Sequence, residues 1–387
     1  MKKFISILGS TGSVGLNTLK IINRKKKYLK PYLFSSNKNY NLICHQIKKY
    51  KPIIFLINDE KVFKKVKKKF IRSRTKIINN LQTSDLKKIS DITVLAISGI
   101  AGLSPTLLMI KKNKKILIAN KESIICGWNL ILKNLILYKT KFIPIDSEHF
   151  SIFQILENSK FDQIEKVYLT ASGGPFLGFK KKQLRNIKPK HALSHPKWSM
   201  GKKISVDSST LMNKVLEYIE AQKLFNLPKE KLDILIHPES LVHAIVKFKN
   251  GLSKFIYHET SMQIPIANAI FDYKINMNIF IKNDNTIKNL SFKIPDFNNY
   301  PIIKILKKVN EHPSTSIIIN ASNEVLVDHF LRKKVPFLSI PIIIKEILGD
   351  RNYKKYAIRK PKNLNQIYEI NSWAKTKTLE KIATKYD

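Results

Sequence analysis

Cysteine and long apolar runs are nearly absent from this 387-residue chain. Cys44 and Cys126 are its only cysteines and have no metal-ligand or redox spacing, which argues against a disulfide framework and favours a reducing compartment. No window approaches the roughly 18 apolar residues of a membrane span. The apolar run 4–8 near the start is shorter than the about 7 to 15 residues of a secretion signal. We therefore expect a soluble, cytoplasmic protein.

Arginine is also scarce. The chain carries 70 Lys and Arg against 28 Asp and Glu, a net charge of +42, yet only seven of the basic residues are Arg. Planar recognition of bases and phosphates favours Arg, and the lysines are scattered along the whole chain. A basic nucleic-acid-binding protein is therefore a remote alternative, and we expect no nucleic-acid or membrane partner. The positive field still favours a phosphorylated small molecule.

The length exceeds one ordinary core, since domains of roughly 100 to 200 residues would make two or three. Up to residue 146, short apolar runs alternate with longer amphipathic stretches. Continuous apolar strands between helices are typical of a parallel sheet covered on both faces. Residues 1–146 are therefore predicted to form a doubly wound, Rossmann-like α/β domain. The expected strands are 4–8, 32–34, 53–57, 92–96, 116–119 and 142–145, and the expected helices include 16–22, 61–70 and 123–137.

The pattern changes after residue 146. Strands are expected at 232–236, 242–248 and 254–257, and Asn250-Gly251 is a hairpin signal because both residues tolerate positive φ. Residues 147–271 are therefore predicted to form an α+β catalytic domain with a mixed sheet. The Asn- and Asp-rich stretch 272–300 is interpreted as a linker, and helical spacing over 301–387 predicts a small C-terminal helical domain.

Gly9, Gly12 and Gly15 lie between the first expected strand and the first expected helix, which is the context of a dinucleotide fingerprint. Glycines permit a tight turn, and the helix N-terminus offers amides to a pyrophosphate. NAD sites place an acidic residue about 20 residues beyond the glycines. No Asp or Glu occurs before Asp59, and the second strand runs instead into residues 35–39, Ser-Ser-Asn-Lys-Asn. NADPH is therefore favoured.

Two polar clusters follow later strands of the same domain. The triplet Asn120-Lys121-Glu122 is interpreted as facing the nicotinamide riboside and the substrate, with a plain helix cap as the alternative. On an extended strand end, Asp146 and Glu148 would point the same way. Their hard oxygens suit Mg²⁺ or Mn²⁺, although a solvated turn is the common reading of such a pair. Glu217 is the candidate third carboxylate, and the neighbouring His149 is interpreted as structural.

The densest polar segment is 195–217. Residues 172–202 have few periodic elements but include Trp198, which predicts a flexible lid over the substrate, with an ordinary surface loop as the alternative. Residues 208–210, Ser-Ser-Thr, precede the helical pattern 211–224, so they are expected to form an anion site at a helix N-terminus. Asn213 and Glu217 lie one turn apart with Lys214 beside them. We expect Asn213 and Lys214 to hold a phosphate while Glu217 turns towards the metal.

Taken together, these motifs resemble the 1-deoxy-D-xylulose 5-phosphate reductoisomerase family. The motifs occur in family order as Gly9-Ser-Thr-Gly-Ser-Val-Gly15, Ala119-Asn-Lys-Glu-Ser123, Pro144-Ile-Asp-Ser-Glu-His149, Leu169-Thr-Ala-Ser-Gly-Gly-Pro-Phe176, His195-Pro-Lys-Trp-Ser-Met-Gly201, Lys203-Ile-Ser-Val-Asp-Ser208, Met212-Asn-Lys214, Leu216-Glu-Tyr218 and Asn320-Ala-Ser-Asn-Glu324. The resemblance implies a homodimeric, NADPH-dependent oxidoreductase with Mg²⁺, Mn²⁺ or Co²⁺. Its expected product is 2-C-methyl-D-erythritol 4-phosphate, on the MEP pathway of isoprene biosynthesis.

The resemblance also implies residue roles. The family's metal ligands fall on Asp146, Glu148 and Glu217, and the catalytic assignments on these three with Lys121 and His195. Substrate contacts fall on Lys121, Ser147, Glu148, Ser172, His195, Trp198, Ser208, Asn213, Lys214 and Glu217. Cofactor contacts fall on Thr11, Gly12, Ser13, Val14, Lys38, Asn39, Asn120, Glu122, Gly201 and Met262.

One residue departs from the family pattern, since Asn37 stands where many relatives have Gly. Asn tolerates left-handed backbone better than most residues, so we expect NADPH binding to survive. The residues leave two routes open for the carbon-skeleton rearrangement, retro-aldol/aldol cleavage and an α-ketol shift. Another NADPH-dependent phosphosugar oxidoreductase is the nearer alternative function, but it would lack the pattern at 195–217.

Overall fold

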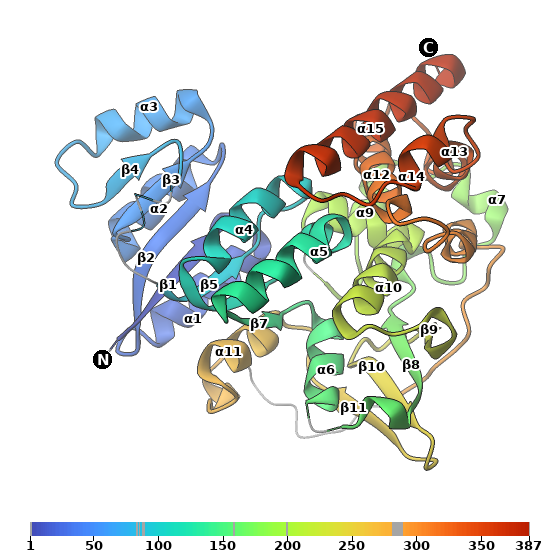
Figure 1. Cartoon of the computed structure of the whole chain (residues 1–387), viewed down its shortest axis with the longest axis horizontal. Helices are drawn as coiled ribbons and strands as arrows, with labels where there is room; N and C mark the ends of the chain where they lie inside the picture. The colour runs from blue at the N-terminus through green and yellow to red at the C-terminus, as the bar shows by residue number, and fades with distance from the viewer. Residues whose placement is uncertain are drawn as a thin grey trace. The chain divides into compact units, whose positions relative to one another are not determined.

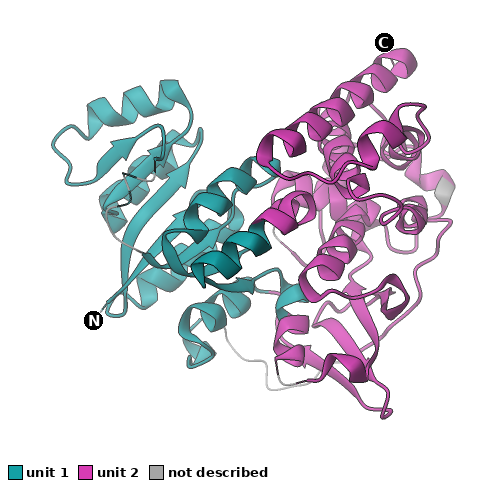
Figure 2. Ribbon diagram, viewed as in Figure 1, with its two compact units in different colours: residues 1–120, 131–150, 261–286 teal, residues 121–130, 151–260, 287–387 magenta. Residues whose placement is uncertain are grey.

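The structure, a computed structural model, describes residues 2–82, 84, 86, 90–157, 159–198, 200–280 and 289–386. Figure 2 shows the two compact units into which the chain divides. Unit 1 comprises Met1–Asn120, Ile131–Phe150 and Ser261–Thr286, and unit 2 comprises Lys121–Leu130, Ser151–Thr260 and Ile287–Asp387. Residues 281–288 of the expected linker and Ser199 of the expected lid lie outside the described residues. The domain boundaries expected from the sequence stay predictions.

Unit 1 is built on a parallel sheet with the strand order β4-β3-β2-β1-β5-β6-β7 (Figure 1). The strands are β1 (Lys3–Leu8), β2 (Leu29–Ser36), β3 (Ile54–Ile57), β4 (Lys76–Ile78), β5 (Ser90–Leu95), β6 (Asn113–Ile118) and β7 (Lys141–Pro144). Ile5, Ile7 and Leu8 of β1 are fully buried, as expected for a strand covered on both faces. The doubly wound fold is therefore confirmed, and only the three-residue β4 was not expected.

Unit 1 also contains helices, besides the first turn of α6 (Ser147–Leu156). They are α1 (Ser13–Arg24), α2 (Tyr40–Tyr50), α3 (Glu60–Lys69), α4 (Leu103–Ile110), the part of α5 (Lys121–Tyr138) after residue 130, and α11 (Gln263–Phe271). Strand order reverses between β1 and β5, and right-handed crossovers then place α1–α3 on one face of the sheet and α4 and α5 on the other. Such a reversal marks the crevice where open α/β sheets bind ligands.

Helix α11 is fastened to the sheet of unit 1 by a buried lysine. The ammonium of Lys115, on β6, lies 2.6 Å from Asp272 Oδ1 and donates to the carbonyl of Ala269 at 3.0 Å. Burial alone lowers the pKa of Lys115, and Asp272 only partly offsets that effect. The contact fixes the C-terminal end of α11, whose N-cap is Met262.

Unit 2 contains a mixed sheet with the order β11-β10-β8-β9. Its strands are β8 (Ile164–Ala171), β9 (Leu232–Ile236), β10 (Val242–Phe248) and β11 (Ser253–Tyr257). β10 pairs antiparallel with β8 and β11, whereas β8 and β9 are parallel. The predicted hairpin is present between β10 and β11, with Gly251 at φ 84° and Asn250 accepting from the amide of Leu252.

Helices make up the rest of unit 2. They are α6 (Ser147–Leu156) after residue 150, α7 (Lys181–Leu184), α8 (Pro189–Leu193), α9 (Lys202–Thr210), α10 (Met212–Phe225), α12 (Thr315–Leu331), α13 (Ser339–Ile347), α14 (Tyr353–Ala357) and α15 (Leu364–Tyr386), with the start of α5. α12 packs against α9, α13 and α15 and is buried along most of its length. The C-terminal helical region is therefore confirmed.

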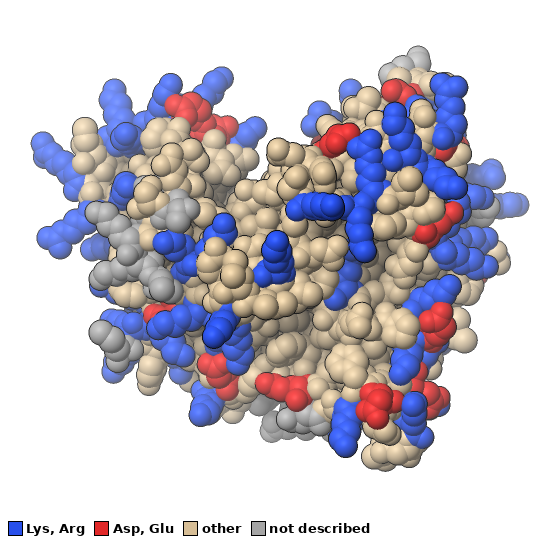
Figure 3. All heavy atoms as spheres, viewed as in Figure 1, with Lys and Arg blue, Asp and Glu red and all other residues tan. Residues whose placement is uncertain are grey.

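The molecular surface carries dispersed positive charge. Figure 3 shows Lys and Arg scattered over the visible face of both units, with Asp and Glu among them. This distribution matches a solvated lysine-rich surface rather than one basic track. Within the part of the chain that the structure describes, no helix is long and apolar enough to cross a membrane.

Candidate active site

The glycine-rich turn of unit 1 is packed too tightly for side chains at two of its glycines. A Cβ on Gly9, at φ 92°, would lie 2.5 Å from the carbonyl oxygen of Ala96, and one on Gly15 would lie 2.4 Å from that of Gly9. A Cβ on Gly12, the N-cap of α1, would lie 3.5 Å from its nearest neighbour, the carbonyl oxygen of Gly9. The turn therefore lets the α1 amides, including those of Ser13 and Val14, face a ligand at close range.

The end of β2 supports the turn with hydroxyl groups. Ser35 Oγ accepts from the amide of Gly9 at 3.0 Å, and Thr11 Oγ1 lies 2.7 Å from Ser36 Oγ. Lys38 is exposed just beyond the strand. This edge offers hydroxyls and a cation rather than a carboxylate, which suits the 2′-phosphate of NADP.

Asn37 and Asn39 lie just beyond the end of β2. Asn37 is not among the residues with positive φ, so its replacement of Gly requires no left-handed backbone. Asn39, expected to contact the cofactor, is the N-cap of α2 and accepts from the amide of Leu42 at 3.2 Å. Its side chain therefore already stabilises the helix start.

Residues 146–149 begin a helix, so the expectation of an extended strand end is wrong. β7 ends at Pro144, and the carbonyl of Asp146 accepts from the amide of Phe150 as the first bond of α6. Asp is a preferred N-cap residue, which explains the early start. One carboxylate oxygen of Asp146 still lies within 4.8 Å of one of Glu148. Both carboxylates therefore remain available at one place in unit 1.

Two groups beside these carboxylates help to orient them. His149 is fully buried, with Nδ1 3.5 Å from Asp146 Oδ1, as a structural histidine requires. Ser147 Oγ donates to Glu148 Oε2 at 2.7 Å.

Asn120, 3% exposed, donates to the carbonyl of Gly99 at 3.0 Å and is held at the end of β6.

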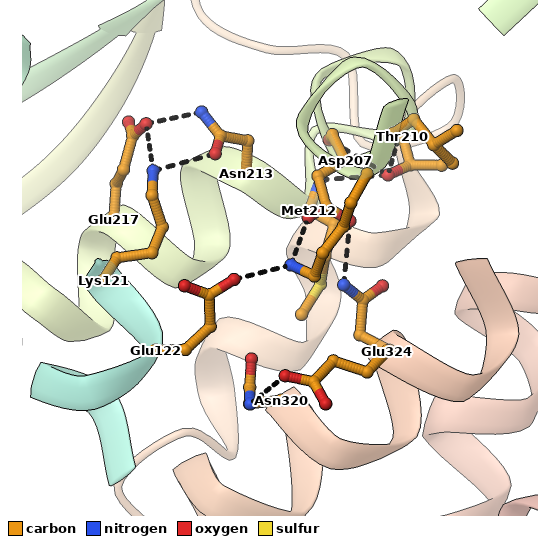
Figure 4. Close-up of polar contacts among 12 residues, drawn as sticks. Lys121, Glu122, Asp207, Thr210, Met212, Asn213, Glu217, Asn320 and Glu324 are labelled. Atoms are coloured by element: carbon orange, nitrogen blue, oxygen red, sulfur yellow. Dashed lines mark hydrogen bonds and ion pairs between the residues drawn. The ribbon is translucent and has the colours of Figure 1, made fainter. Parts of the chain in front are cut away.

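A buried cluster of charged side chains in unit 2 surrounds Glu217. This carboxylate is 1% exposed and accepts from Lys121 Nζ at 2.9 Å. It also forms an ion pair with Lys214 and accepts from the side-chain amide of Asn213, one helical turn earlier on α10. Lys121 Nζ donates in turn to Asn213 Oδ1 at 2.9 Å, and Figure 4 shows Lys121, Asn213 and Glu217 facing one another. Two ammonium groups thus share one carboxylate in a buried site.

A second group of unit 2 joins the expected lid to the substrate residues. His195 Nδ1 accepts from the backbone amides of Lys197 and Trp198 at 3.2 and 3.0 Å, so its ring proton lies on Nε2 and is donated to Ser172 Oγ at 3.1 Å. Burial lowers the pKa of His195, which keeps the ring neutral. The Trp198 ring lies edge-on to His243 with centroids 6.0 Å apart.

Ser208, Ser209 and Thr210 do precede a helix, α10, but they are not its N-cap, and only Thr210 Oγ1 accepts from its first amide, that of Met212, at 3.2 Å. These residues form the last turn of α9, and α10 begins only after Leu211, a left-handed residue at φ 63°. Ser209 and Thr210 donate to carbonyls of α9 instead of facing an anion. Ser208 is partly exposed, and its carbonyl lies where a Cβ on Gly174 would be 2.9 Å away. The loop after Ser172 therefore packs on the end of α9.

The predicted site residues divide between the units. In unit 1 are Thr11, Gly12, Ser13, Val14, Lys38, Asn39, Asn120, Asp146, Ser147, Glu148 and Met262. In unit 2 are Lys121, Glu122, Ser172, His195, Trp198, Gly201, Ser208, Asn213, Lys214 and Glu217. The contacts above bring together Lys121, Asn213, Lys214 and Glu217, and separately Ser172, His195 and Trp198.

Sequence reasoning missed a chain of polar contacts that starts at Glu122 and runs through the partly buried Lys203 to the buried Asp207 and Asn323. Lys203 Nζ lies 3.1 Å from Glu122 Oε1 and 2.7 Å from Asp207 Oδ2, and Asn323 Nδ2 donates to Asp207 Oδ1 at 2.8 Å. The i, i+4 spacing of Lys203 and Asp207 was the available signal for one of these contacts. Nothing local in the sequence indicated the contact with Asn323.

Unit 1 combines a doubly wound sheet with a glycine-rich turn, and unit 2 has a mixed sheet and buries a carboxylate between lysines. These features define a dinucleotide-dependent oxidoreductase with its own catalytic unit. The model of 1-deoxy-D-xylulose 5-phosphate reductoisomerase matches residues 5–127. The model of the C-terminal domain of that enzyme matches 142–225, and a further DXP reductoisomerase C-terminal domain matches 258–377. The chain belongs to the 1-deoxy-D-xylulose 5-phosphate reductoisomerase family.

Individual relatives agree with this assignment. The chain is 47% identical to the 1-deoxy-D-xylulose 5-phosphate reductoisomerase of Pelagibacter ubique, over 97% of this chain and 98% of that protein. It is 39% identical to the Clostridium novyi enzyme, over 97% and 99%. A crystal structure of a DOX-P reductoisomerase in complex with NADPH, fosmidomycin and magnesium matches with a TM-score of 0.92 at 29% identity, covering all of both chains. The Zymomonas mobilis enzyme in complex with NADPH matches with a TM-score of 0.87 at 28% identity, covering 99% of each.

Proposed function

We propose that the chain converts 1-deoxy-D-xylulose 5-phosphate into 2-C-methyl-D-erythritol 4-phosphate, with NADPH as reductant and a divalent metal ion. The observation that carries this proposal is the buried cluster of Lys121, Asn213, Lys214 and Glu217. It supplies an acidic ligand for a cation and two ammonium groups for an anion in one place. An enzyme that must hold a metal ion and a sugar phosphate together requires this combination of charges.

For the cofactor, we assign NADPH to unit 1 and to the starts of two helices in unit 2. The turn at Gly12 and the α1 amides fit a pyrophosphate, and Lys38 suits the 2′-phosphate. The full set of proposed contacts is Thr11, Gly12, Ser13, Val14, Lys38, Asn39, Asn120, Glu122, Gly201 and Met262. Asn39 would act chiefly through the backbone that it caps.

For the metal, the proposed ligands are Asp146, Glu148 and Glu217. Carboxylate oxygens are the ligands that Mg²⁺ and Mn²⁺ prefer, and the buried Glu217 forms ion pairs with two lysines. When bound, the ion supplies Lewis-acid chemistry at the substrate's carbonyl and hydroxyl oxygens. Lys121 contacts the Glu217 carboxylate, so it lies beside the reacting end of the substrate in this arrangement.

For the substrate, we propose that its phosphate binds to Ser172, Ser208, Asn213 and Lys214. Holding this remote group orients the reacting carbons and supplies binding energy for the rearrangement. Ser147, Glu148, Lys121 and Glu217 would contact the reacting end. Neutral His195 donates to Ser172 and fixes the adjoining backbone up to Trp198, so this segment is suited to cover the carbon chain and exclude water.

The assembly and the location of the protein also belong to this proposal. We propose a homodimer in the cytoplasm, with domains at 1–146, 147–271 and 301–387. Both cysteines are buried and free. Sedimentation equilibrium of the purified chain tests the dimer, for which twice the 44.8 kDa mass is expected.

The experiment that tests the function follows NADPH oxidation with 1-deoxy-D-xylulose 5-phosphate, with and without Mg²⁺ or Mn²⁺, and identifies the product by NMR. Substrate- and metal-dependent oxidation with formation of 2-C-methyl-D-erythritol 4-phosphate is expected. Folded protein that oxidises no NADPH under these conditions, or that reduces the substrate without rearranging its skeleton, contradicts the proposal.

A further inference from the structure

The segment 320–324 has no part in the assignments above, although it belongs to the motifs by which the chain resembles its family. It lies on α12, where Asn323 is fully buried and donates from Nδ2 to Asp207 Oδ1 at 2.8 Å. Asn320, also fully buried, donates to Glu324 Oε1 at 3.2 Å. α12 is therefore fastened to α9, the helix that has Gly201 as its N-cap and Ser208 in its last turn.

The contact continues from α9 to the start of α5. Asp207 uses its other oxygen to hold Lys203, one turn earlier, at 2.7 Å. The same ammonium lies 3.1 Å from Glu122 Oε1 in the first turn of α5. In Figure 4, dashed lines join Glu122 and Asp207 through this ion-pair bridge. A chain of polar contacts thus links Asn323, Asp207, Lys203 and Glu122, which come from three helices.

Helix stability does not explain a lysine at this position. Lys203 lies in the first turn of α9, where the positive end of the helix dipole disfavours a cation. The carboxylates that compensate it are themselves buried, with side chains 8% exposed for Glu122 and 2% exposed for Asp207. The bridge therefore keeps three charges at the price of desolvation, which is typical of a group held for its position rather than for stability.

The ionisation of the bridge follows from the same contacts. Burial alone would lower the pKa of Lys203, but Asp207 and Glu122 raise it above its ordinary value. Burial alone would raise the pKa of Glu122, but Lys203 lowers it. Lysine and glutamate therefore remain charged at neutral pH, and the geometry of the bridge does not depend on a proton.

We propose that Lys203 is a positioning residue for the cofactor. Held by Asp207 and Asn323, it fixes the carboxylate of Glu122 and the helix start that follows Gly201. The inference rests on the proposed assignment of Glu122 and Gly201 to NADPH. In this arrangement, Asn323 of the 320–324 segment holds Asp207 and, through it, Lys203.

NADPH binding to the full chain, measured by calorimetry without substrate or metal, tests this role. The variants are Lys203→Met, Lys203→Arg and Asn323→Ala, and the melting temperature of each is recorded. Lys202→Met is the matched control, because Lys202 is exposed in the same turn of α9. Loss of one charged hydrogen bond to Glu122 is expected to weaken NADPH binding about tenfold in Lys203→Met. Lys203→Arg is expected to restore binding to within about threefold of wild type, because a guanidinium can span both carboxylates.

Several outcomes would overturn the positioning role. Wild-type NADPH affinity in folded Lys203→Met would overturn it. So would a KM of this variant for 1-deoxy-D-xylulose 5-phosphate that rises as much as its NADPH dissociation constant. If Lys203→Met does not fold, Asn323→Ala decides, because it leaves all three charges in place. A weakening of about threefold is expected there, and unchanged affinity overturns the proposal.

Glu122→Gln separates the inference from its premise. Unchanged NADPH affinity in this variant rejects the cofactor role of Glu122, and the positioning role with it. Weakened binding in Glu122→Gln combined with intact binding in Lys203→Met rejects the positioning role alone and leaves the proposed function standing.

Discussion

Lys121 Nζ donates to Glu217 Oε1 at 2.9 Å across 96 residues of sequence, and both side chains are almost completely buried. Lys214 forms a second ion pair with the same carboxylate. A buried carboxylate shared by two ammonium groups leaves a net positive charge. The two lysines are then complementary to an anionic substrate, and the carboxylate of Glu217 is complementary to a cationic metal.

Removing the ammonium of Lys214 tests the phosphate grip. Lys214→Met is expected to raise the KM for 1-deoxy-D-xylulose 5-phosphate by about 10- to 100-fold, the loss of one or two charge-assisted hydrogen bonds. NADPH affinity should change little, because Lys214 is not assigned to the cofactor. Steady-state kinetics at saturating NADPH measure the effect, with Lys202→Met as the control for charge. An unchanged KM in the folded variant rejects the assignment.

Two glycines of the same turn are expected to respond differently to substitution. In Gly15→Ala the added Cβ meets Gly9 O at 2.4 Å, so the turn must shift, with a loss of about 1 to 3 kcal/mol in the free energy of unfolding. In Gly12→Ala the nearest contact is 3.5 Å, so stability should be kept.

NADPH binding shows whether the added methyl group disturbs the fold of the turn or blocks the cofactor. Gly12→Ala is expected to weaken NADPH binding without lowering the melting temperature, because the new methyl group stands where the pyrophosphate approaches. Calorimetric titration and thermal denaturation of both variants measure the two effects. Full NADPH affinity in Gly12→Ala would place the cofactor elsewhere.

The pH dependence of stability reports on His195. Burial lowers its pKa below the ordinary 6.5, so the folded protein binds this proton less readily than the unfolded chain does. The contribution of His195 to stability is therefore present above pH 6.5 and is lost as the pH falls through its folded pKa. Urea unfolding should show a larger stability difference between wild type and His195→Gln at pH 7.5 than at pH 5. His45→Gln, at an exposed position, is the control, and equal differences at both pH values would contradict a half-buried, neutral His195.

Much of unit 1 could be predicted because buried parallel strands are continuous apolar runs, and residues 4–8 or 116–119 admit little else. β4 could not be predicted, because its three residues are not fully buried and form no long apolar run. The break at Leu211 was also hidden, since a left-handed backbone usually calls for Gly or Asn. Without that break, the hydroxyls at 208–210 are indistinguishable from an N-cap.

The site was predicted from local motifs, and its long-range contacts were not. Asn213 and Glu217 are one turn apart on α10, so their contact follows from helical spacing alone. Lys203 is one lysine among many, and only the packing of α12 against α9 brings Asn323 to Asp207 and so gives Lys203 its partners. Such a relation depends on tertiary structure and leaves no periodic signal.

Glu217 is the metal ligand proposed in unit 2, and the metal dependence of a Glu217→Gln variant tests this assignment. NADPH oxidation with this substrate is titrated with Mg²⁺ for wild type, Glu217→Gln and Glu230→Gln, a control on an exposed carboxylate. Wild type and Glu230→Gln should show the same saturable Mg²⁺ dependence, whereas Glu217→Gln should need at least about 100-fold more metal or lose turnover. Wild-type turnover and Mg²⁺ dependence in Glu217→Gln would contradict the account.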